Sequence, residues 1–195
     1  MSDRVLILAA GTILLGLVFG IRIGSRALSG ASGAAPTAGA QAPDVAGVVA
    51  QPPYIFLAFL AGATVLEALV PLPVAAAYPV ARYVAGAALI VVALAIAFAA
   101  GARFHAAGTN IPPSLPTTAL VVDGVYAWTR NPLYLGAMLV FGGLAVAAGS
   151  LWALLLLIPF AWVINVGVIA REERYLERKF GDAYRAYKGR VRRWL

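Results

Sequence analysis

Long apolar stretches alternate with short polar connections along the sequence. Each of the five longest apolar runs holds 16 to 21 residues, close to the roughly 20 residues that a helix needs to cross a bilayer. The runs are Val5–Ile23, Pro53–Leu72, Val80–Ala100, Leu133–Ala148 and Leu151–Ala170. This pattern predicts an all-α integral membrane protein with about five transmembrane helices.

The fourth and fifth runs are separated only by Gly149 and Ser150, which predicts a tight helical hairpin between helices 4 and 5. Beyond the fifth run, apolar and aromatic residues recur on one side of a helical pattern, at Leu176, Phe180, Tyr184, Tyr187, Val191 and Leu195. This stripe predicts a C-terminal amphipathic helix at the membrane interface. Gly181 is expected to divide that helix into two pieces.

The same pattern divides the chain into three parts. We expect a first transmembrane helix over residues 1–28, a flexible linker rich in Gly, Ala and Pro over 29–52, and a membrane core over 53–195. A signal peptide carries its positive charge before the apolar run, whereas here Arg22 and Arg26 follow it. We therefore expect the first helix to be retained.

Composition and charge exclude several classes of protein. Of the 195 residues, 62% are hydrophobic and 12% are charged, against about 45–50% and about 25% in soluble domains. An ordinary cytosolic enzyme and a disordered chain are thereby excluded. The 15 Lys and Arg outnumber the 8 Asp and Glu, but nine of the basic residues lie within 171–195, directly after an apolar run. That position indicates contact with anionic lipid, and no nucleic acid is expected as a partner.

The basic residues also predict the topology. Five spans with the basic tail on the cytoplasmic side place 13 of the 15 Lys and Arg on that face. We therefore expect a multi-pass protein with a cytoplasmic C-terminus. The chain has no cysteine and a single histidine, His105, so neither a Cys-based nor a His-rich metal site is expected.

Two polar segments on this face hold the candidate chemistry. Three prolines, at 112, 113 and 116, oppose a regular helix in the segment Arg103–Asn131. Pro132 suits the first turn of the fourth helix, whose N-terminus can hold an anion such as a carboxylate. Asn131 could cap that helix and Arg130 could pair with the same anion. Since the fourth and fifth helices run antiparallel, Glu172–Glu173 should return to this point.

Motifs in the two segments resemble a known family. The first reads G-x-Y-x-x-x-R-N-P-x-Y over 124–134, and the second reads REERYLERKFGDAYRAY over 171–187. Together they resemble the integral membrane methyltransferases that include isoprenylcysteine carboxyl methyltransferases and phospholipid N-methyltransferases. Many members have His where this chain has Asn131, and an amide cannot titrate as an imidazole does.

This resemblance implies an enzyme that uses S-adenosyl-L-methionine, bound at the cytoplasmic face by residues 103–195, while a hydrophobic small-molecule or lipid-linked acceptor approaches from the bilayer. The implied cofactor-binding residues are Gly124, Tyr126, Arg130, Asn131, Tyr134, Glu172 and Glu173. The chemistry of methyl transfer makes Arg130 and Glu173 the candidate catalytic residues. Arg130 or Arg171 would hold a carboxylate acceptor, and Glu173 could take a proton from an amine or thiol. The expected location is a bacterial inner membrane.

The acceptor remains open at this stage. Carboxyl O-methylation of an isoprenylcysteine-like substrate is the favoured reaction, and phospholipid amine N-methylation and thiol methylation are the alternatives. A rival of another class is a non-enzymatic small transporter or assembly factor. In that case Glu67 and Asn165 would line a path through the membrane. Otherwise Asn165 is expected to form a helix–helix hydrogen bond, and Glu67 is open to either a functional role or a hydrogen-bonded packing role.

Overall fold

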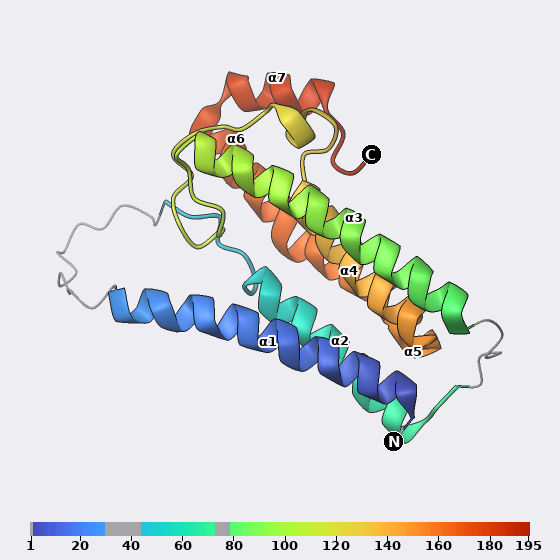
Figure 1. The fold of residues 1–195 in the computed structure, drawn as a ribbon. Coiled ribbons are helices and arrows are strands. Elements are labelled where there is room, and N and C mark those ends of the chain that lie inside the picture. Colours follow the sequence, from blue (N-terminus) through green and yellow to red (C-terminus); the bar gives the residue numbers. More distant parts are fainter. Residues whose placement is uncertain (1, 30–43, 73–78) are drawn as a thin grey trace.

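A computed structural model of the chain describes residues 2–29, 44–72 and 79–195 (Figure 1). Within these ranges the regular structure is helical and contains no strand, so the predicted all-α fold is confirmed. The greater part of the predicted linker, residues 30–43, lies outside the described residues.

The helices follow the apolar runs closely. Their bounds are α1 Asp3–Ser29, α2 Pro52–Leu69, α3 Pro79–Ala106, η1 Gly124–Ala127, α4 Pro132–Ala148, α5 Leu151–Val163, η2 Ile164–Ile169, α6 Ala170–Phe180 and α7 Asp182–Arg190. Helix α3 continues six residues beyond its apolar run, so Arg103 and His105 lie on its last turns and not in the loop that we expected. Gly181, with φ of 54°, separates α6 from α7 as predicted.

Three described helices are long and apolar enough to cross a membrane: Pro52–Leu69, Pro79–Ala106 and the continuous helical segment Leu151–Phe180. Helix α4 is apolar but shorter. The apolar part of the last segment ends at Ala170, because seven of the ten residues in 171–180 are charged. The membrane-spanning part is therefore α5 with η2, and α6 extends beyond it.

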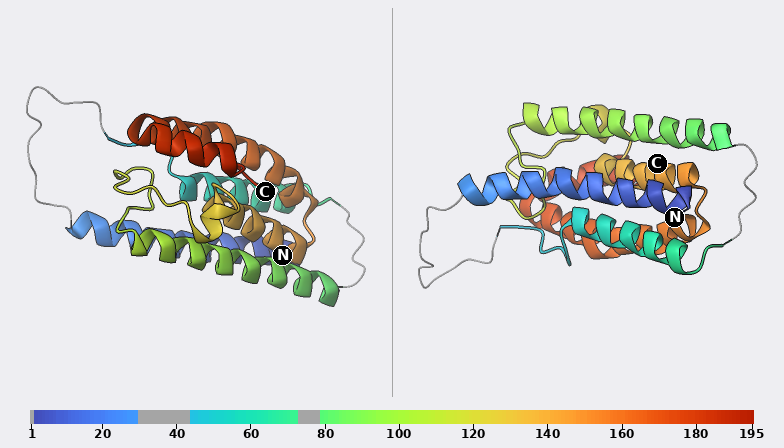
Figure 2. Two further views of the ribbon diagram at one scale, coloured as in Figure 1. Left: turned by 90° about the horizontal axis from the view of Figure 1, so that it is seen from above. Right: turned by 60° about the horizontal axis from the view of Figure 1, so that its bottom comes forward.

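Small and aromatic side chains hold the bundle together. Helix α4 contacts α3 on one side and α1, α2 and α5 on others (Figure 2). A Cβ atom on Gly86 of α3 would lie 2.6 Å from the carbonyl oxygen of Gly143 of α4, so only glycine permits this approach. Phe56, Phe141 and Phe160, from α2, α4 and α5, form a core cluster with ring centroids 5.2–5.6 Å apart.

The predicted tight hairpin is present between α4 and α5. Gly149 ends α4 in the left-handed region, with φ of 61°, and Ser150 caps α5 by accepting a hydrogen bond from the Ala153 amide. The Ser150 hydroxyl also donates a 2.6 Å hydrogen bond to buried Glu67 of α2. Arg4 of α1 pairs with the other oxygen of Glu67 at 3.3 Å. Glu67 thus joins three parts of the bundle, an arrangement that fits the packing role, one of the two roles that the sequence left open.

Segments that are distant in sequence gather at the opposite end of the bundle (Figure 1). They are residues 44–51, which we call the strap, the loop of residues 107–131, helices α6 and α7, and the C-terminal residues 191–195. Direct bonds join the first three, since the Ala46 amide donates to Pro113 and the Thr117 amide donates to Tyr175 of α6. This end holds the candidate site.

Candidate functional site

The site begins where the first turn of α4 meets the first turn of α6. Pro132 is the first residue of α4, which places Tyr134 on its first turn. The Tyr134 hydroxyl donates a 2.6 Å hydrogen bond to Oε1 of Glu172. The antiparallel hairpin therefore brings the R-N-P-x-Y motif and the glutamate pair together.

Glu172 is the carboxyl partner in this hydrogen bond, which uses its Oε1 atom. It lies on α6, beyond the membrane-spanning segment, and is partly exposed. Burial raises the pKa of its carboxyl to about 7, although the hydrogen bond from Tyr134 acts in the opposite direction. A carboxyl with this pKa is partly protonated near neutral pH, and a cationic group of a ligand placed beside it would stabilise its ionised form.

Glu173 is held between two guanidinium groups. Nη2 of Arg130 lies 3.1 Å from Oε1 of Glu173. Nε of Arg193 donates to the same oxygen at 3.1 Å, and Nη2 of Arg193 pairs with Oε2. The Glu173 carboxylate is buried, and its hydrogen bonds raise the pKa of Arg193 above the usual range. Both oxygens of Glu173 thus already accept charge-assisted hydrogen bonds.

Arg130 has unused hydrogen-bonding capacity. Its side chain is 9% exposed, and its buried Nε and Nη1 atoms find no hydrogen-bond acceptor among the described residues. A buried donor without a partner costs about 1–3 kcal/mol. An anionic group from a ligand would satisfy these atoms.

The C-terminal residues fold back against the loop before α4. The carbonyl oxygen of Arg193 accepts hydrogen bonds from the Thr129 hydroxyl at 3.1 Å and from Nδ2 of Asn131 at 2.9 Å. The Arg130 amide donates to the carbonyl oxygen of Arg192 at 3.0 Å. Asn131 occupies the N-cap position of α4. Its side chain does not cap the helix as we expected, because its amide is bonded to Arg193. It anchors the C-terminal segment instead.

Arg193 is the site residue that sequence reasoning missed. Besides Glu173, its Nη1 donates a 3.1 Å hydrogen bond to Oδ1 of Asn165 in η2. In the sequence it is one of nine basic residues in a tail that we expected to face lipid. Arg193 lies beyond the end of α7 at Arg190 and is not one of the regularly spaced apolar positions. No periodic signal in the sequence therefore distinguished it from the neighbouring basic residues.

The remaining two candidates lie further from the carboxylates. Tyr126 is buried, and its carbonyl oxygen accepts a 2.7 Å hydrogen bond from the Tyr187 hydroxyl. Burial raises the pKa of the Tyr126 phenol well above its usual value. Gly124, with φ of 60°, lies against Arg103, whose Nε would be 2.6 Å from a Cβ atom at this position. The positive φ favours glycine at this position, and any larger side chain would also have to displace the Arg103 side chain.

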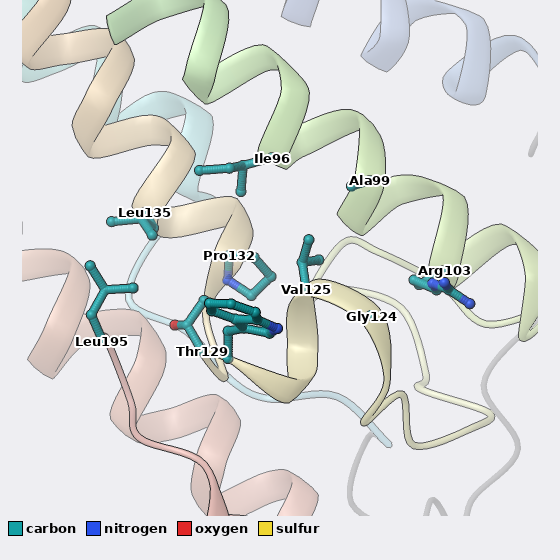
Figure 3. A pocket seen from close by; sticks show the side chains of 10 residues that line it. Ile96, Ala99, Arg103, Gly124, Val125, Thr129, Pro132, Leu135 and Leu195 are labelled. Atoms are coloured by element: carbon teal, nitrogen blue, oxygen red, sulfur yellow. The ribbon is translucent and has the colours of Figure 1, made fainter.

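An apolar cavity of about 430 Å³ adjoins the loop that carries Arg130 (Figure 3). It is bounded by α3, η1 and the start of α4, with Ile96, Val125 and Leu135 among its apolar walls. Arg103 lies at one end and pairs with Asp123 at 3.1 Å. Trp128 also lines it and is 79% exposed. The cavity can accommodate part of a hydrocarbon chain beside the polar cluster.

Comparison with known proteins supplies the family. The profile of the family described as "Phospholipid methyltransferase" matches residues 81–183, which is more than half of the chain and covers the first motif and most of the second. The chain belongs to the phospholipid methyltransferase family. Membership supports a membrane enzyme that transfers methyl groups, in agreement with the resemblance found in the sequence.

Two curated relatives match shorter segments of this family member. An uncharacterized protein from Haemophilus influenzae is 51% identical over 63 residues, which are 32% of this chain and the whole of that protein. A protein-S-isoprenylcysteine O-methyltransferase from Schizosaccharomyces pombe is 36% identical over 72 residues, 37% of this chain and 30% of the yeast protein. No solved structure gives a significant match.

Proposed function

We propose that this protein uses S-adenosyl-L-methionine to methylate a hydrophobic or membrane-borne acceptor at the cluster around Arg130. The observation that carries the proposal is the buried Arg130 side chain, whose Nε and Nη1 have no acceptor among the described residues, and which pairs with Glu173, the neighbour of Glu172 on α6. The cofactor bears a carboxylate and an ammonium group, which complement the side chains of Arg130 and Glu172. When bound, it supplies a methyl group on a positively charged sulfur.

The residues of the cluster take separate roles in this proposal. Arg130 holds the carboxylate of the cofactor through its Nε and Nη1 atoms, and Glu172 accepts hydrogen bonds from the ammonium group of the cofactor. Glu173 already accepts bonds from Arg130 and Arg193, so we assign to it the positioning of both guanidinium groups. Tyr134 orients Glu172 through its hydrogen bond.

The favoured reaction is carboxyl O-methylation of an isoprenylcysteine-like compound. This reaction is supported by the name of the yeast relative, a protein-S-isoprenylcysteine O-methyltransferase. A carboxylate acceptor is already a nucleophile at neutral pH, so the reaction needs no base. The apolar cavity next to the loop that carries Arg130 suits the hydrocarbon part of such an acceptor. Alignment of the acceptor with the methyl group then supplies much of the acceleration.

The second candidate is N-methylation of a phospholipid amine. The family description supports it, and an amine acceptor must lose a proton during the reaction. In this second candidate Glu172 takes the proton and no longer binds the ammonium group, and burial, which raises the pKa of its carboxyl to about 7, suits it to this role. We further propose that the site faces the cytoplasm of a bacterial cell at the inner membrane, since this end of the bundle carries the basic tail.

A methyl-transfer assay tests the proposal. The purified protein in lipid nanodiscs is incubated with methyl-labelled S-adenosyl-L-methionine and either a prenylcysteine analogue or total bacterial lipid. We expect label in a base-labile ester for O-methylation, or in the amine head group for N-methylation. Arg130→Ala should abolish transfer, whereas Arg174→Ala, which removes an exposed arginine from α6, should not. Absence of label in both acceptors would contradict the proposed activity.

A further inference from the structure

A π-helical turn lies immediately before the helix that carries the glutamate pair. It is η2, Ile164–Ile169, and α6 begins at the next residue. A π-turn holds about one more residue than an α-helical turn, so it rotates all following side chains by about 100° around the helix axis. The direction in which Glu172 and Glu173 point therefore depends on this turn.

The strap docks directly onto the π-turn. The Val49 amide donates a 3.2 Å hydrogen bond to the carbonyl oxygen of Gly167, in the middle of η2. A Cβ atom on Gly167 would lie 2.4 Å from Cγ2 of Val49, so the contact requires glycine at this position. Val49 itself is 59% exposed, which means that its docking buries little apolar surface.

The strap is also attached to α6 around the glutamate pair. Nη1 of Arg171 donates a 3.0 Å hydrogen bond to the carbonyl oxygen of Gly47. One turn further along, the Tyr175 hydroxyl donates to Oδ1 of Asp44 at 3.0 Å, and Lys179 pairs with the other oxygen of Asp44. The strap thus spans the surface of α6 from the π-turn past the two glutamates.

We propose that the strap is the positioning element of the site: its docking on Gly167 and Tyr175 maintains the π-turn and thereby directs Glu172 and Glu173 toward Tyr134 and Arg130. The identity of the ligand in this inference rests on the proposed function. Because ligand binding and strap docking require the same orientation of α6, each stabilises the other. Val49, Gly167 and Tyr175 are positioning residues, since they act on the site through α6.

A size exchange at the contact tests this role. Gly167→Ala should displace the strap and weaken the binding of S-adenosylhomocysteine, measured by calorimetric titration of the full chain in nanodiscs, by about tenfold. Adding Val49→Ala removes the clashing Cγ2 atom and should restore the affinity. The number of binding sites in the same titration reports the folded fraction, so a loss of stability alone would lower that number and leave the affinity unchanged.

A single introduced thiol reports whether the strap is docked. The chain has no cysteine of its own, and Ala46 on the strap is 8% exposed. We expect an Ala46→Cys variant to react slowly with a maleimide, more rapidly when Gly167→Ala is added, and more slowly again when S-adenosylhomocysteine is bound. Tyr175→Phe, which removes the hydroxyl but keeps the ring, should act in the same direction and serves if Gly167→Ala fails to fold.

Three results would overturn the inference. The first is a Gly167→Ala variant whose strap is labelled rapidly but whose affinity for S-adenosylhomocysteine is unchanged. The second is a rate of labelling of the Ala46→Cys variant that neither Gly167→Ala nor Tyr175→Phe increases. The third is a loss of affinity in Gly167→Ala that Val49→Ala does not restore. Failure of the proposed function is distinguishable, because the parent protein itself would then not bind S-adenosylhomocysteine.

Discussion

The Tyr134 hydroxyl donates a 2.6 Å hydrogen bond to Glu172 across 38 positions of the sequence. The two residues lie on the first turns of α4 and α6, and they meet because the chain reverses at Gly149 and Ser150. This bond joins the two motifs that identify the family. It also acts on the carboxyl of Glu172, whose pKa burial raises to about 7.

Removal of this hydrogen bond should shift the titration of Glu172. The bond from Tyr134 opposes the rise that burial causes in the Glu172 pKa, so Tyr134→Phe should raise that pKa further. We expect the pH midpoint of S-adenosylhomocysteine binding to move upward, which a series of calorimetric titrations between pH 5.5 and about 9 can measure. A midpoint that stays in place would show that the hydroxyl does not influence Glu172.

The wild-type protein should show opposite pH trends with and without ligand. The Glu172 pKa is raised from 4.5 to about 7, so the folded state retains a proton that the unfolded state loses in this window. The contribution of Glu172 to the free energy of unfolding therefore decreases as the pH rises from 4.5 to 7. The ammonium group of S-adenosylhomocysteine favours the carboxylate, so affinity should increase as the pH passes through about 7.

Calorimetry and thermal unfolding over the same pH range test both trends. Glu172→Gln should abolish the pH dependence of binding, whereas Glu177→Gln, on the same helix, should preserve it. An affinity that is constant between pH 6 and about 8 in the wild-type protein would contradict the assignment of Glu172 to a cationic group.

Arg193 should be required for binding. Arg193→Ala removes two hydrogen bonds from Glu173 and one from Asn165. Because Glu173 then has only Arg130 as an ionic partner, we expect affinity for S-adenosylhomocysteine to fall by about tenfold or more. Arg193→Lys should recover part of the loss, since it restores the charge without the fork of donors. Arg192→Ala is the matched control, and an equal loss in this variant would show that only the basic charge of the tail matters.

Glu67 should matter for stability and not for binding. It lies at the end of the bundle away from the site and accepts hydrogen bonds from Ser150 and Arg4. Glu67→Gln should lower the thermal unfolding temperature, corresponding to about 1–3 kcal/mol, with unchanged affinity for S-adenosylhomocysteine. Thr64→Val, on the same helix, should have a smaller effect because its hydroxyl bonds within its own helix. A loss of affinity for S-adenosylhomocysteine in Glu67→Gln, without a loss of stability, would contradict this expectation and show that Glu67 is energetically coupled to the site.

The membrane helices could be predicted from the sequence because lipid imposes a simple rule on them. A spanning segment must be apolar and long enough, and the five apolar runs correspond to α1 to α5, although α4 is shorter than a spanning helix needs. The π-turn could not be predicted, since Ile164–Ile169 is apolar throughout and carries no signal for its winding. The strap was also missed, because it is attached by single hydrogen bonds and ion pairs to η2, α6 and the loop, which leave no periodic pattern in the sequence.

The candidate site could be predicted only in part. The hairpin argument correctly placed Glu172 and Glu173 next to Arg130 and Tyr134, since antiparallel helices return to the same level. It could not assign partners, because the sequence does not reveal that Arg193 folds back onto Glu173. The same contact explains why Asn131 binds the C-terminal segment and does not cap α4.

The most direct test of the central claim is a calorimetric titration of the nanodisc-embedded protein with S-adenosylhomocysteine. The account predicts binding at one site per chain that Arg130→Ala and Glu172→Gln both weaken and that the exposed-residue variant Arg174→Ala leaves unchanged. Absence of binding by the folded wild-type protein, or binding that is indifferent to Arg130 and Glu172, would contradict it.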